Sequence, residues 1–374
     1  MLLDHPPAMP GFRVSRVADG PSGKSVEQKP EHGEAFAMPA GHLVKGVSAL
    51  VDPDGREIVK WIKTREDAAA QAEAMRAAVE AFKSEIPHAL PTVAPKHVNA
   101  DLLNQYTITD LHLNAHAWGK QTGADWGLKI GERLIMDWFA AAIDLAPPAE
   151  RAVFAELGDW LHFDAQQAIT PEHGNLLDAD SRQQKAIQVA IRVLRWIVRR
   201  LLAKHAQVHI IFADANHDPV AGAWLREMFA AFYDREPRIT VDTSPKTYYC
   251  VEHGLTSLFY HHGHRRGPAK GVDTVFAGEF REVFGRTKFS YAHTGHKHAD
   301  ELRSTNLMKV EQHETLAGRD AYAANGGWIT GRSAKVITYS RRFGEVSRLI
   351  LSPEMVAGAS VGLASKDVDN SPGE

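Results

Sequence analysis

The sequence predicts an α/β fold, because from about residue 104 short apolar segments alternate with stretches of helical periodicity. Five of these segments have the length and composition of strands: Tyr106–Thr109, Ala152–Leu157, Val208–Ala213, Ser257–Tyr260 and Lys288–Ala292. Residues 183–204 are the clearest helix, with an apolar stripe formed by Ile187, Ile191, Leu194, Val198 and Leu201. A hairpin of residues 334–339 and 345–351 closes the predicted domain.

Composition divides the chain into four predicted parts. Residues 1–35 are rich in Pro, Gly and charge, which is typical of a mobile arm. Residues 36–100 predict a ββα appendage with a Pro-rich connector: two strands, 43–51 and 57–64, are followed by a helix over 66–83. The main domain is expected over 101–352, and a polar tail over 353–374.

Bulk composition excludes little beyond a membrane protein. The 374 residues carry a net charge of −3, which gives no global electrostatic reason to bind nucleic acid and none against a local basic cleft. The chain shows neither a signal peptide nor 18 successive apolar residues. Cys250 is the only cysteine, which fits a reducing compartment, so we expect a cytoplasmic protein. The oligomeric state stays open, a homodimer included.

Five polar clusters each follow one of the five predicted strands. They are Asp110-Leu111-His112, Gly158-Asp159-Trp160-Leu161-His162, Asn216-His217-Asp218, His261-His262-Gly263-His264 and Gly295-His296-Lys297-His298. Side chains at the ends of strands in an α/β sheet converge on a ligand, so we expect the five clusters to meet.

The residue types in these clusters suit divalent metal ions. Carboxylate, imidazole and amide oxygen are ligands for Mn, Fe or Zn, and the lack of a thiolate argues against a structural zinc knot. Residues i and i+2 of an extended segment point to one side, so Asp110 with His112 presents two ligands to one place, as does His296 with His298. One such cluster alone is common in surface turns, but five in succession predict a metal centre.

In this order, the motifs Asp-x-His, Gly-Asp, Asn-His-Asp, His and Gly-His-x-His resemble the calcineurin-like metallophosphoesterase superfamily over about residues 104–350. The stretch Gly158–His162 is similar to SbcD-type DNA repair nucleases, and the whole chain looks most like phage- and prophage-encoded members. The resemblance implies a four-layer α-β-β-α sandwich of two mixed sheets with the ββα appendage at its N-terminal side. It also implies two divalent metal ions, with Mn expected first and Fe, Zn, Ni or Mg as alternatives.

Carried over residue by residue, the resemblance implies one metal held by Asp110, His112 and His298, and a second held by Asn216, His262 and His296, with Asp159 as the bridge. Two positions depart from the superfamily pattern or leave it ambiguous. Ala215 stands where Gly is usual, which is acceptable only if φ there is not positive. His261, His262 and His264 compete for one ligand position, and we assign it to His262 because Gly263 follows directly.

Two further histidines are the predicted catalytic residues. A hydroxide bridging the two metals would attack phosphorus, and His217 is the best candidate to stabilise or protonate the leaving group, because its unperturbed pKa is about 6.5. By resemblance His162 would assist His217, or it would instead orient a ligand through a hydrogen bond. The sequence leaves both roles of His162 open.

The predicted function is hydrolysis of phosphodiester bonds, with a phosphate ester as substrate and DNA, through a nuclease activity, among the candidates. A small-molecule nucleotide phosphodiesterase or phosphomonoesterase is the first alternative, and a non-catalytic scaffold that keeps the fold is the second. Arg265, Arg266 and Lys270 would contact a substrate backbone or form a solvated loop. Trp118 and Trp160 would stack on a base or pack in the core.

Overall fold

The computed structural model describes residues 12–20, 23–30, 42–51, 57–66 and 88–361. The chain divides into two units, residues 1–71 and 72–374, and each is described by itself. The first unit holds two antiparallel hairpins, β1 (Phe12–Gly20) with β2 (Gly23–Pro30) and β3 (His42–Val51) with β4 (Glu57–Glu66).

These hairpins agree with the sequence prediction in one case and differ in the other. The strands β3 and β4 lie where they were predicted, whereas the predicted helix over 66–83 falls outside the described residues except for Glu66, which ends β4. The hairpin of β1 and β2 lies within residues 1–35, for which a mobile arm but no strand was predicted, and the mobility of this arm stays a prediction. A bulge between Val14 and Arg16 interrupts the alternation of apolar residues, which explains why the sequence did not reveal the strand.

The second unit is built on two mixed sheets. The six-stranded sheet has the order β15 (Gly344–Leu351), β14 (Ala334–Ser340), β5 (Asn99–Ile108), β6 (Ala149–Glu156), β7 (Gln207–Phe212) and β8 (Ile239–Val241). The five-stranded sheet has the order β12 (Glu301–Ser304), β13 (Lys309–Gln312), β11 (Phe289–Thr294), β10 (Thr256–Tyr260) and β9 (Tyr249–His253). Strands β5 to β8 are parallel, as are β10, β11 and β13.

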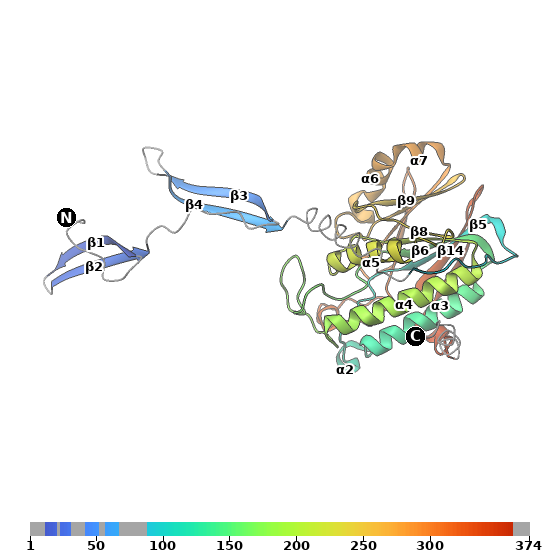
Figure 1. The fold of residues 1–374 in the computed structure, drawn as a ribbon, viewed down its shortest axis with the longest axis horizontal. Helices are drawn as coiled ribbons and strands as arrows, with labels where there is room; N and C mark the ends of the chain where they lie inside the picture. The colour runs from blue at the N-terminus through green and yellow to red at the C-terminus, as the bar shows by residue number, and fades with distance from the viewer. Residues whose placement is uncertain (1–11, 21–22, 31–41, 52–56, 67–87, 362–374) are drawn as a thin grey trace. The chain divides into compact units, whose positions relative to one another are not determined.

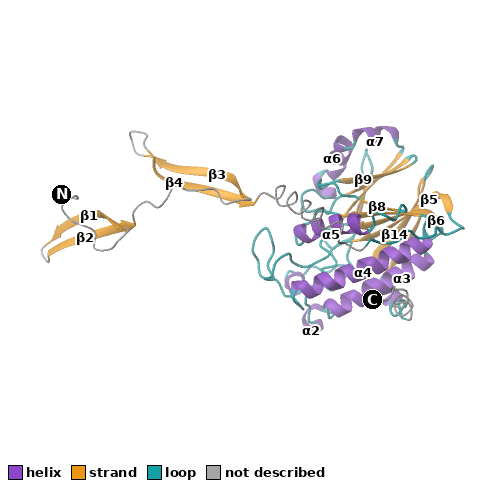
Figure 2. Cartoon of the chain, viewed as in Figure 1, coloured by secondary structure: helices purple, strands orange, loops and turns teal. Residues whose placement is uncertain are grey.

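Helices cover the outer face of each sheet. Figure 1 shows α3 (Leu128–Leu145) and α4 (Gln183–Lys204) side by side along one sheet and α6 (Val272–Glu279) with α7 (Arg281–Arg286) beyond the other. The short helices α2 (Gly119–Thr122) and α8 (Ala321–Asn325) contact each other, and α5 (Pro219–Phe232) packs on β7. Figure 2 gives the same view by type of element. The predicted four-layer α-β-β-α sandwich is confirmed.

Three apolar cores fill the spaces between these layers. Alternation along β6 shows the arrangement, because Phe154 faces the core under α3 and α4 whereas Val153 and Ala155 face the core between the sheets. A third core, which includes Phe259 and Phe276, lies between the five-stranded sheet and α6.

The helix α4 spans the predicted residues 183–204, but its buried face differs from the predicted stripe. Ile187 is 39% exposed, whereas Ala186, Val193 and Ile197 are fully buried. The reason is that α4 packs against both α3 and the sheet, so its buried face is wide and includes alanines that a stripe of large residues omits.

The segment after residue 353 is not wholly the loose tail that was predicted. Helix α9 (Pro353–Val356) buries Val356, and the Asp137 carboxylate of α3 accepts hydrogen bonds from the main-chain N–H groups of Gly358 (2.9 Å) and Ser360 (2.8 Å). Residues 362–374 of the predicted tail lie outside the described residues.

A buried ion-pair network joins the two sheets. Glu311 on β13 accepts hydrogen bonds from Lys335 on β14 (2.7 Å) and, in a bidentate pair, from Arg348 on β15 (2.5 and 2.9 Å). His293 on β11 is close by, 3.0 Å from His313 Nε2. One carboxylate of the five-stranded sheet is thus shared by two cations of the six-stranded sheet, and these cations also bind Asp300 (Lys335, 2.6 Å) and Glu345 (Arg348, 2.9 Å).

No helix among the described residues is long and apolar enough to cross a bilayer.

We expect Glu311→Leu to lower the free energy of unfolding by about 1.5–3 kcal/mol, because it removes the carboxylate that Lys335 and Arg348 share, although each keeps a second acidic partner, Asp300 and Glu345. Urea unfolding of the metal-free protein measures the change. The matched control is Glu279→Gln, which removes an exposed partner of Lys246 and should cost less than about 1 kcal/mol. Equal unfolding midpoints for the two variants would show that Glu311 does not stabilise the contact between the two sheets.

Candidate metal centre

The seven predicted ligands follow the ends of five strands that meet at one edge of the sandwich. Asp110 and His112 follow β5, Asp159 follows β6, Asn216 follows β7, His262 follows β10, and His296 and His298 follow β11. Six of them, all except the amide Asn216, fall into two groups whose ligand atoms lie within 4.8 Å of one another. One group is Asp110, His112 and His298, and the other is Asp110, Asp159, His262 and His296.

The backbone marks the same residues independently of their side chains. Within the described part of the chain, the non-glycine residues with positive φ are Asp110 (51°), His112 (43°), Asp159 (56°), His296 (73°) and His298 (52°). This conformation is uncommon for residues with a Cβ and costs about 1–3 kcal/mol each, so it persists only where the surroundings enforce it. All five are predicted ligands.

In the first group, three ligand atoms approach as they would around a cation. His298 Nε2 lies 3.2 Å from Asp110 Oδ1 and 3.3 Å from His112 Nε2. Ligands about 2.1 Å from one metal ion at roughly right angles are separated by about 3 Å. Asp110 Oδ1 is buried without a hydrogen-bond partner, which is costly unless a cation binds there.

In the second group, His262 is the central residue. Its Nδ1 donates to the Leu157 carbonyl oxygen (2.9 Å), which orients Nε2 towards Asn216 Oδ1 (2.9 Å) and Asp159 Oδ2 (3.2 Å). A carbonyl partner on the far ring nitrogen is the usual way in which a protein fixes a metal-binding histidine. Two divalent cations therefore fit the residues present, the second with an amide oxygen among its ligands.

The carboxylate common to both groups is Asp110, whereas the sequence analysis gave the bridging position to Asp159. Asp159 lies in the second group, next to His262. The bridging role of Asp159 stays a prediction.

The pKa values show how the metal-free site balances its charge. Burial lowers the pKa of His262, but the Asp159 and Asp110 carboxylates outweigh burial and raise it to about 10. Burial raises the pKa of Asp159, but His262 outweighs this effect and holds it well below its usual value. His262 Nε2 therefore carries a proton in the place that a cation would take. Burial, followed by His217 and His162, lowers the pKa of His112, which leaves a neutral ring able to bind a metal.

The two predicted catalytic histidines lie beside His112. His162 Nδ1 is 3.2 Å from His112 Nδ1, and the rings of His112 and His217 are 4.8 Å apart between centroids. His217 donates its main-chain N–H to Asp159 Oδ1 (2.8 Å) and its ring Nδ1–H to the His162 carbonyl oxygen (2.8 Å). Burial, followed by His217, lowers the pKa of His162 to about 3.

The geometry bears on three points that the sequence left open. His261 is turned away from the cluster, with Nδ1 2.9 Å from the Thr247 carbonyl oxygen, whereas His262 faces it. Ala215 is not among the described residues with positive φ, so it meets the condition set for a residue in the place of Gly. Trp160 is buried in the core, whereas Trp118 is 56% exposed.

His264, which competed with His261 and His262 for one ligand position, is a neighbour of the second group. Its ring centroid lies 5.4 Å from that of His262 and 6.4 Å from that of His296, and its Nδ1 is buried without a hydrogen-bond partner. The only signal in the sequence was its spacing of two from His262.

Two glycines are required by close packing. A Cβ at Gly158, where φ is 105°, would lie 2.4 Å from Ala215 Cβ and 3.0 Å from His262 Nδ1. A Cβ at Gly295 would lie 1.8 Å from Thr109 Oγ1 and 2.7 Å from Asp110 Oδ2. Both glycines let the ligand-bearing loops approach one another.

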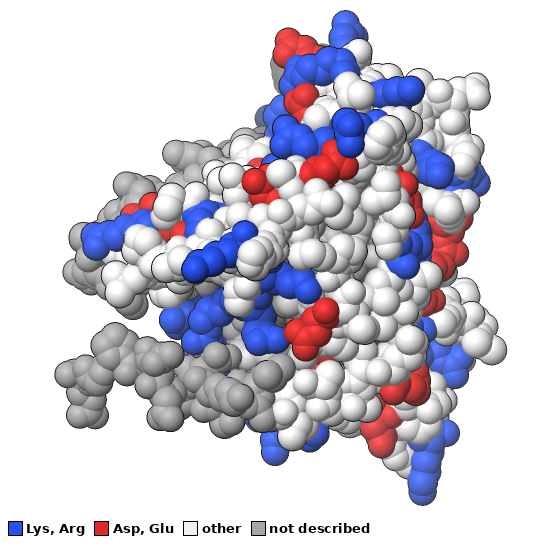
Figure 3. All heavy atoms as spheres, turned by 90° about the vertical axis from the view of Figure 1, so that its right-hand side faces the viewer, with Lys and Arg blue, Asp and Glu red and all other residues white. Residues whose placement is uncertain are grey.

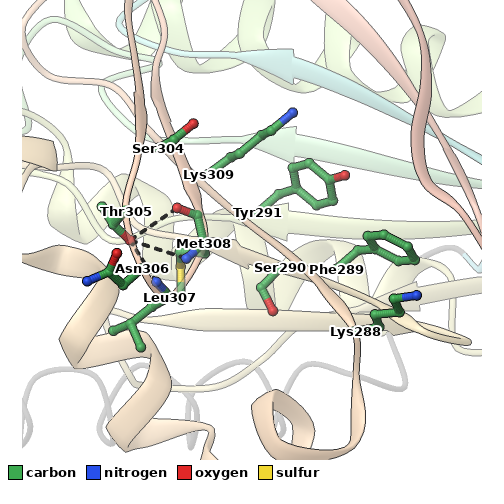
Figure 4. Close-up of a pocket in the computed structure, with 10 residues that line it drawn as sticks. All are labelled: Lys288, Phe289, Ser290, Tyr291, Ser304, Thr305, Asn306, Leu307, Met308 and Lys309. Carbon is green, nitrogen blue, oxygen red and sulfur yellow. Dashed lines mark hydrogen bonds between the residues drawn. The ribbon is translucent and has the colours of Figure 1, made fainter.

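A hollow of about 290 Å³ lies away from the ligands (Figure 4). It is lined by residues at the start of β11, such as Lys288 and Tyr291, and by the turn between β12 and β13, where Thr305 Oγ1 donates to the Met308 carbonyl oxygen (3.1 Å). Because His296 and His298 follow the other end of β11, this hollow is not the substrate site of the metal centre.

No protein-family model matches the chain, and no curated protein matches its sequence. Among solved structures, it is similar to a Streptococcus pneumoniae protein described as a predicted phosphoesterase (10% identity, 68% of this chain, 99% of that one, TM-score 0.30). It is also similar to zinc-complexed Vps29 of Entamoeba histolytica (10% identity, 67% and 99%, TM-score 0.28). A third structure is a 5′-nucleotidase of Candida albicans (12% identity, 76% and 58%, TM-score 0.33).

We expect Mn²⁺ binding to the metal-free protein to release protons, because the proton on His262 Nε2 must leave before the ring can bind a cation. The apparent affinity should therefore rise with pH, by up to about tenfold per unit for one proton while the pH stays below about 10. Titration calorimetry in two buffers of different ionisation enthalpy measures the release, and His262→Gln should release fewer protons than the wild type, although burial of the ligand His298 is likewise outweighed by Asp110, which raises the pKa of that ring. Identical heats in both buffers would contradict the assignment.

Proposed function

We propose that the chain is a phosphodiesterase of the calcineurin-like metallophosphoesterase superfamily that works with two divalent cations, Mn being the first candidate. The observation that carries the proposal is the set of five strained ligand residues, all with positive φ and all at one place. Strain of this kind is kept at functional sites, and the ligand atoms there already stand at distances suited to cations. The cations would activate a water molecule and neutralise charge on phosphate oxygens.

The burial of the ligands defines how a substrate would approach. Asp110, Asp159 and His262 form a buried floor, whereas Asn216 and His296 are partly exposed and His298 has 36% of its side chain exposed. A phosphate group would therefore meet the site from the side of Asn216, His296 and His298.

His217 is suited to the leaving group. Its main-chain N–H and its Nδ1 are both held by hydrogen bonds, so the ring is fixed and Nε2 is the nitrogen left to exchange a proton. An imidazole in this position can donate to the departing oxygen and so lower the barrier to its release.

His162 is better suited to positioning than to proton transfer. With Nε2 of His112 in the first ligand group, Nδ1 of His112 carries the proton and donates it to His162 Nδ1. The lowered pKa of His162 keeps its ring neutral, as an acceptor must be. Of the two roles left open by the sequence, orientation of His112 is the one that this geometry supports.

The nuclease form of the proposal depends on the likeness of Gly158–His162 to SbcD-type enzymes and on the exposed cations Arg265 and Lys297 near the ligands. A small-molecule diester is the alternative. Figure 3 shows one face of the molecule, on which Lys and Arg are interspersed with Asp and Glu.

We expect the Mn²⁺ form to hydrolyse bis(4-nitrophenyl) phosphate faster than 4-nitrophenyl phosphate, and to cleave single- or double-stranded DNA. Asp159→Asn should lower kcat by about a thousandfold, since it removes several kcal/mol of transition-state stabilisation by the cations. Lys288→Ala, in the hollow away from the ligands, is the control and should keep full activity.

Turnover of the small diester without any cleavage of DNA would remove the nuclease part. A protein that binds neither Mn²⁺ nor Zn²⁺ and hydrolyses none of these esters would instead be the non-catalytic scaffold.

We expect His162→Gln to affect mainly Mn²⁺ binding and His217→Gln to affect mainly kcat. Loss of the hydrogen bond to His112 should weaken Mn²⁺ binding about 10- to 100-fold and spare most of kcat at saturating Mn²⁺. His217→Gln should lower kcat about 100-fold or more at every Mn²⁺ concentration, and less for a nitrophenolate leaving group than for an alcohol. Steady-state rates across a Mn²⁺ series measure both. A kcat defect in His162→Gln that Mn²⁺ does not rescue would make His162 a proton donor.

A further inference from the structure

Two aromatic side chains stand exposed on and just after α8. Tyr322 is 74% exposed and Trp328 is 53% exposed, and their ring centroids are 5.1 Å apart with an angle of 53° between the rings. Ile329, the next residue, is 85% exposed. An exposed apolar cluster of this kind indicates a binding surface.

Hydrogen bonds and packing connect this aromatic pair to the metal centre. Thr315 Oγ1 donates to the Asp110 carbonyl oxygen (2.7 Å), and three residues later the Cα of Gly318 packs against Trp126, where a Cβ would lie 3.1 Å from Trp126 Cβ. Trp126 Nε1 in turn donates to the His112 carbonyl oxygen (3.1 Å). The segment that leads to α8 is therefore connected to Asp110 and His112, the first two ligands of the first group.

Helix α2 lies next to the aromatic pair and also begins near the first ligand group. Arg319 donates to the Thr122 carbonyl oxygen at the end of α2 and to the Trp328 carbonyl oxygen, both at 3.3 Å. Trp118, which precedes α2, is 56% exposed and has Lys120 Nζ 5.7 Å from its ring centroid. Exposed aromatic rings and cationic side chains thus lie close to one another on this surface, which we call the aromatic rim of the site.

We propose that Tyr322 and Trp328 form a stacking platform for the nucleobase of a substrate whose phosphate lies at the metal centre; the inference rests on the proposed function. The ring pair itself is too close for a base to enter, since a base between two rings needs about 7 Å, twice a normal contact distance. A base therefore stacks on the outer face of one ring. Such stacking accepts every base, because each has an apolar face.

The platform also has a reason to select nucleotides over other esters. The cations at the metal centre recognise only the phosphate, which all phosphate esters share. Arg319 binds the carbonyl oxygen of Trp328, and Lys120 lies over the ring of Trp118 before α2; both cations would meet further phosphates of a strand. The platform would accept a mononucleotide ester or one end of a single strand, and these two sources share the nucleobase.

The test compares two diesters with the same leaving group, thymidine 5′-(4-nitrophenyl phosphate) and methyl 4-nitrophenyl phosphate, using the Mn²⁺ enzyme. For Trp328→Ala and Tyr322→Ala combined, kcat/KM for the thymidine ester should fall about 5- to 100-fold, as expected for the loss of one stacked base. The methyl ester should change by less than about twofold, and Trp328→Phe should recover part of the loss. Cleavage of end-labelled decathymidylate by the same variants distinguishes a strand from a mononucleotide.

The matched control is Phe343→Ala. Phe343 is 62% exposed and follows Ser340, which pairs with Leu102 near the start of β5, at the opposite end of the sheet from the ligands. An equal loss for both esters, a loss no larger than that of Phe343→Ala, or a change from dimer to monomer with both esters equally affected would overturn the platform.

A separate measurement distinguishes failure of the proposed function from failure of the stacking platform. If the wild-type protein hydrolyses neither ester, the phosphodiesterase proposal fails, and the platform is judged by quenching of tryptophan fluorescence with decathymidylate. Quenching that is lost in Trp328→Ala upholds the platform, whereas equal quenching or none in the two proteins overturns it.

Discussion

Each of two buried aspartates holds a neighbouring loop with one carboxylate oxygen and turns the other oxygen towards the ligand groups. Asp110 Oδ2 accepts the main-chain N–H of His296 (2.8 Å), and its Oδ1 faces His298. Asp159 Oδ1 accepts the main-chain N–H of His217 (2.8 Å), and its Oδ2 faces His262. Two side chains thus connect four loops, and they do so without any cation. The centre is therefore preorganised, and binding energy of the cations is not spent on ordering the loops.

The same arrangement concentrates negative charge. Asp218, itself buried, accepts main-chain N–H groups from Asp159 (3.1 Å) and Leu161 (2.8 Å), and Glu156 accepts that of Gly158 (2.7 Å). Burial raises the pKa of Asp218, and the Asp159 charge raises it further. Buried carboxylates so close together cost free energy, and the raised pKa values of Asp218, Glu156 and His262 show that the metal-free site favours binding protons to offset it. Divalent cations remove that cost, which links metal binding to the stability of the fold.

Much of the fold and most of the ligand set could be predicted because both follow from short-range patterns. Strands such as β6 and β10 contain short apolar runs that are followed within a few residues by Asp159 or His262, so the sequence indicates both the strand and the ligand after it. Other features depend on distant contacts. The pairing of Glu311 with Lys335 joins two sheets, and nothing near either residue indicates it. The conflict between His261 and His262 is decided by where a strand ends, which is the least certain part of any pattern.

The division of the site into a charged floor and an aromatic rim separates two tasks. In the proposed reaction, the cations and His217 would act where the charge on phosphate changes, so their contribution would lower the barrier. Stacking on Tyr322 or Trp328 would act on a group that does not react, so it would bind the ground state and the transition state alike and raise kcat/KM through binding. Selectivity among phosphate esters would then be set outside the ligand motifs, on loops that the superfamily pattern does not define. This explains why seven predicted ligands point to a chemistry without defining a substrate.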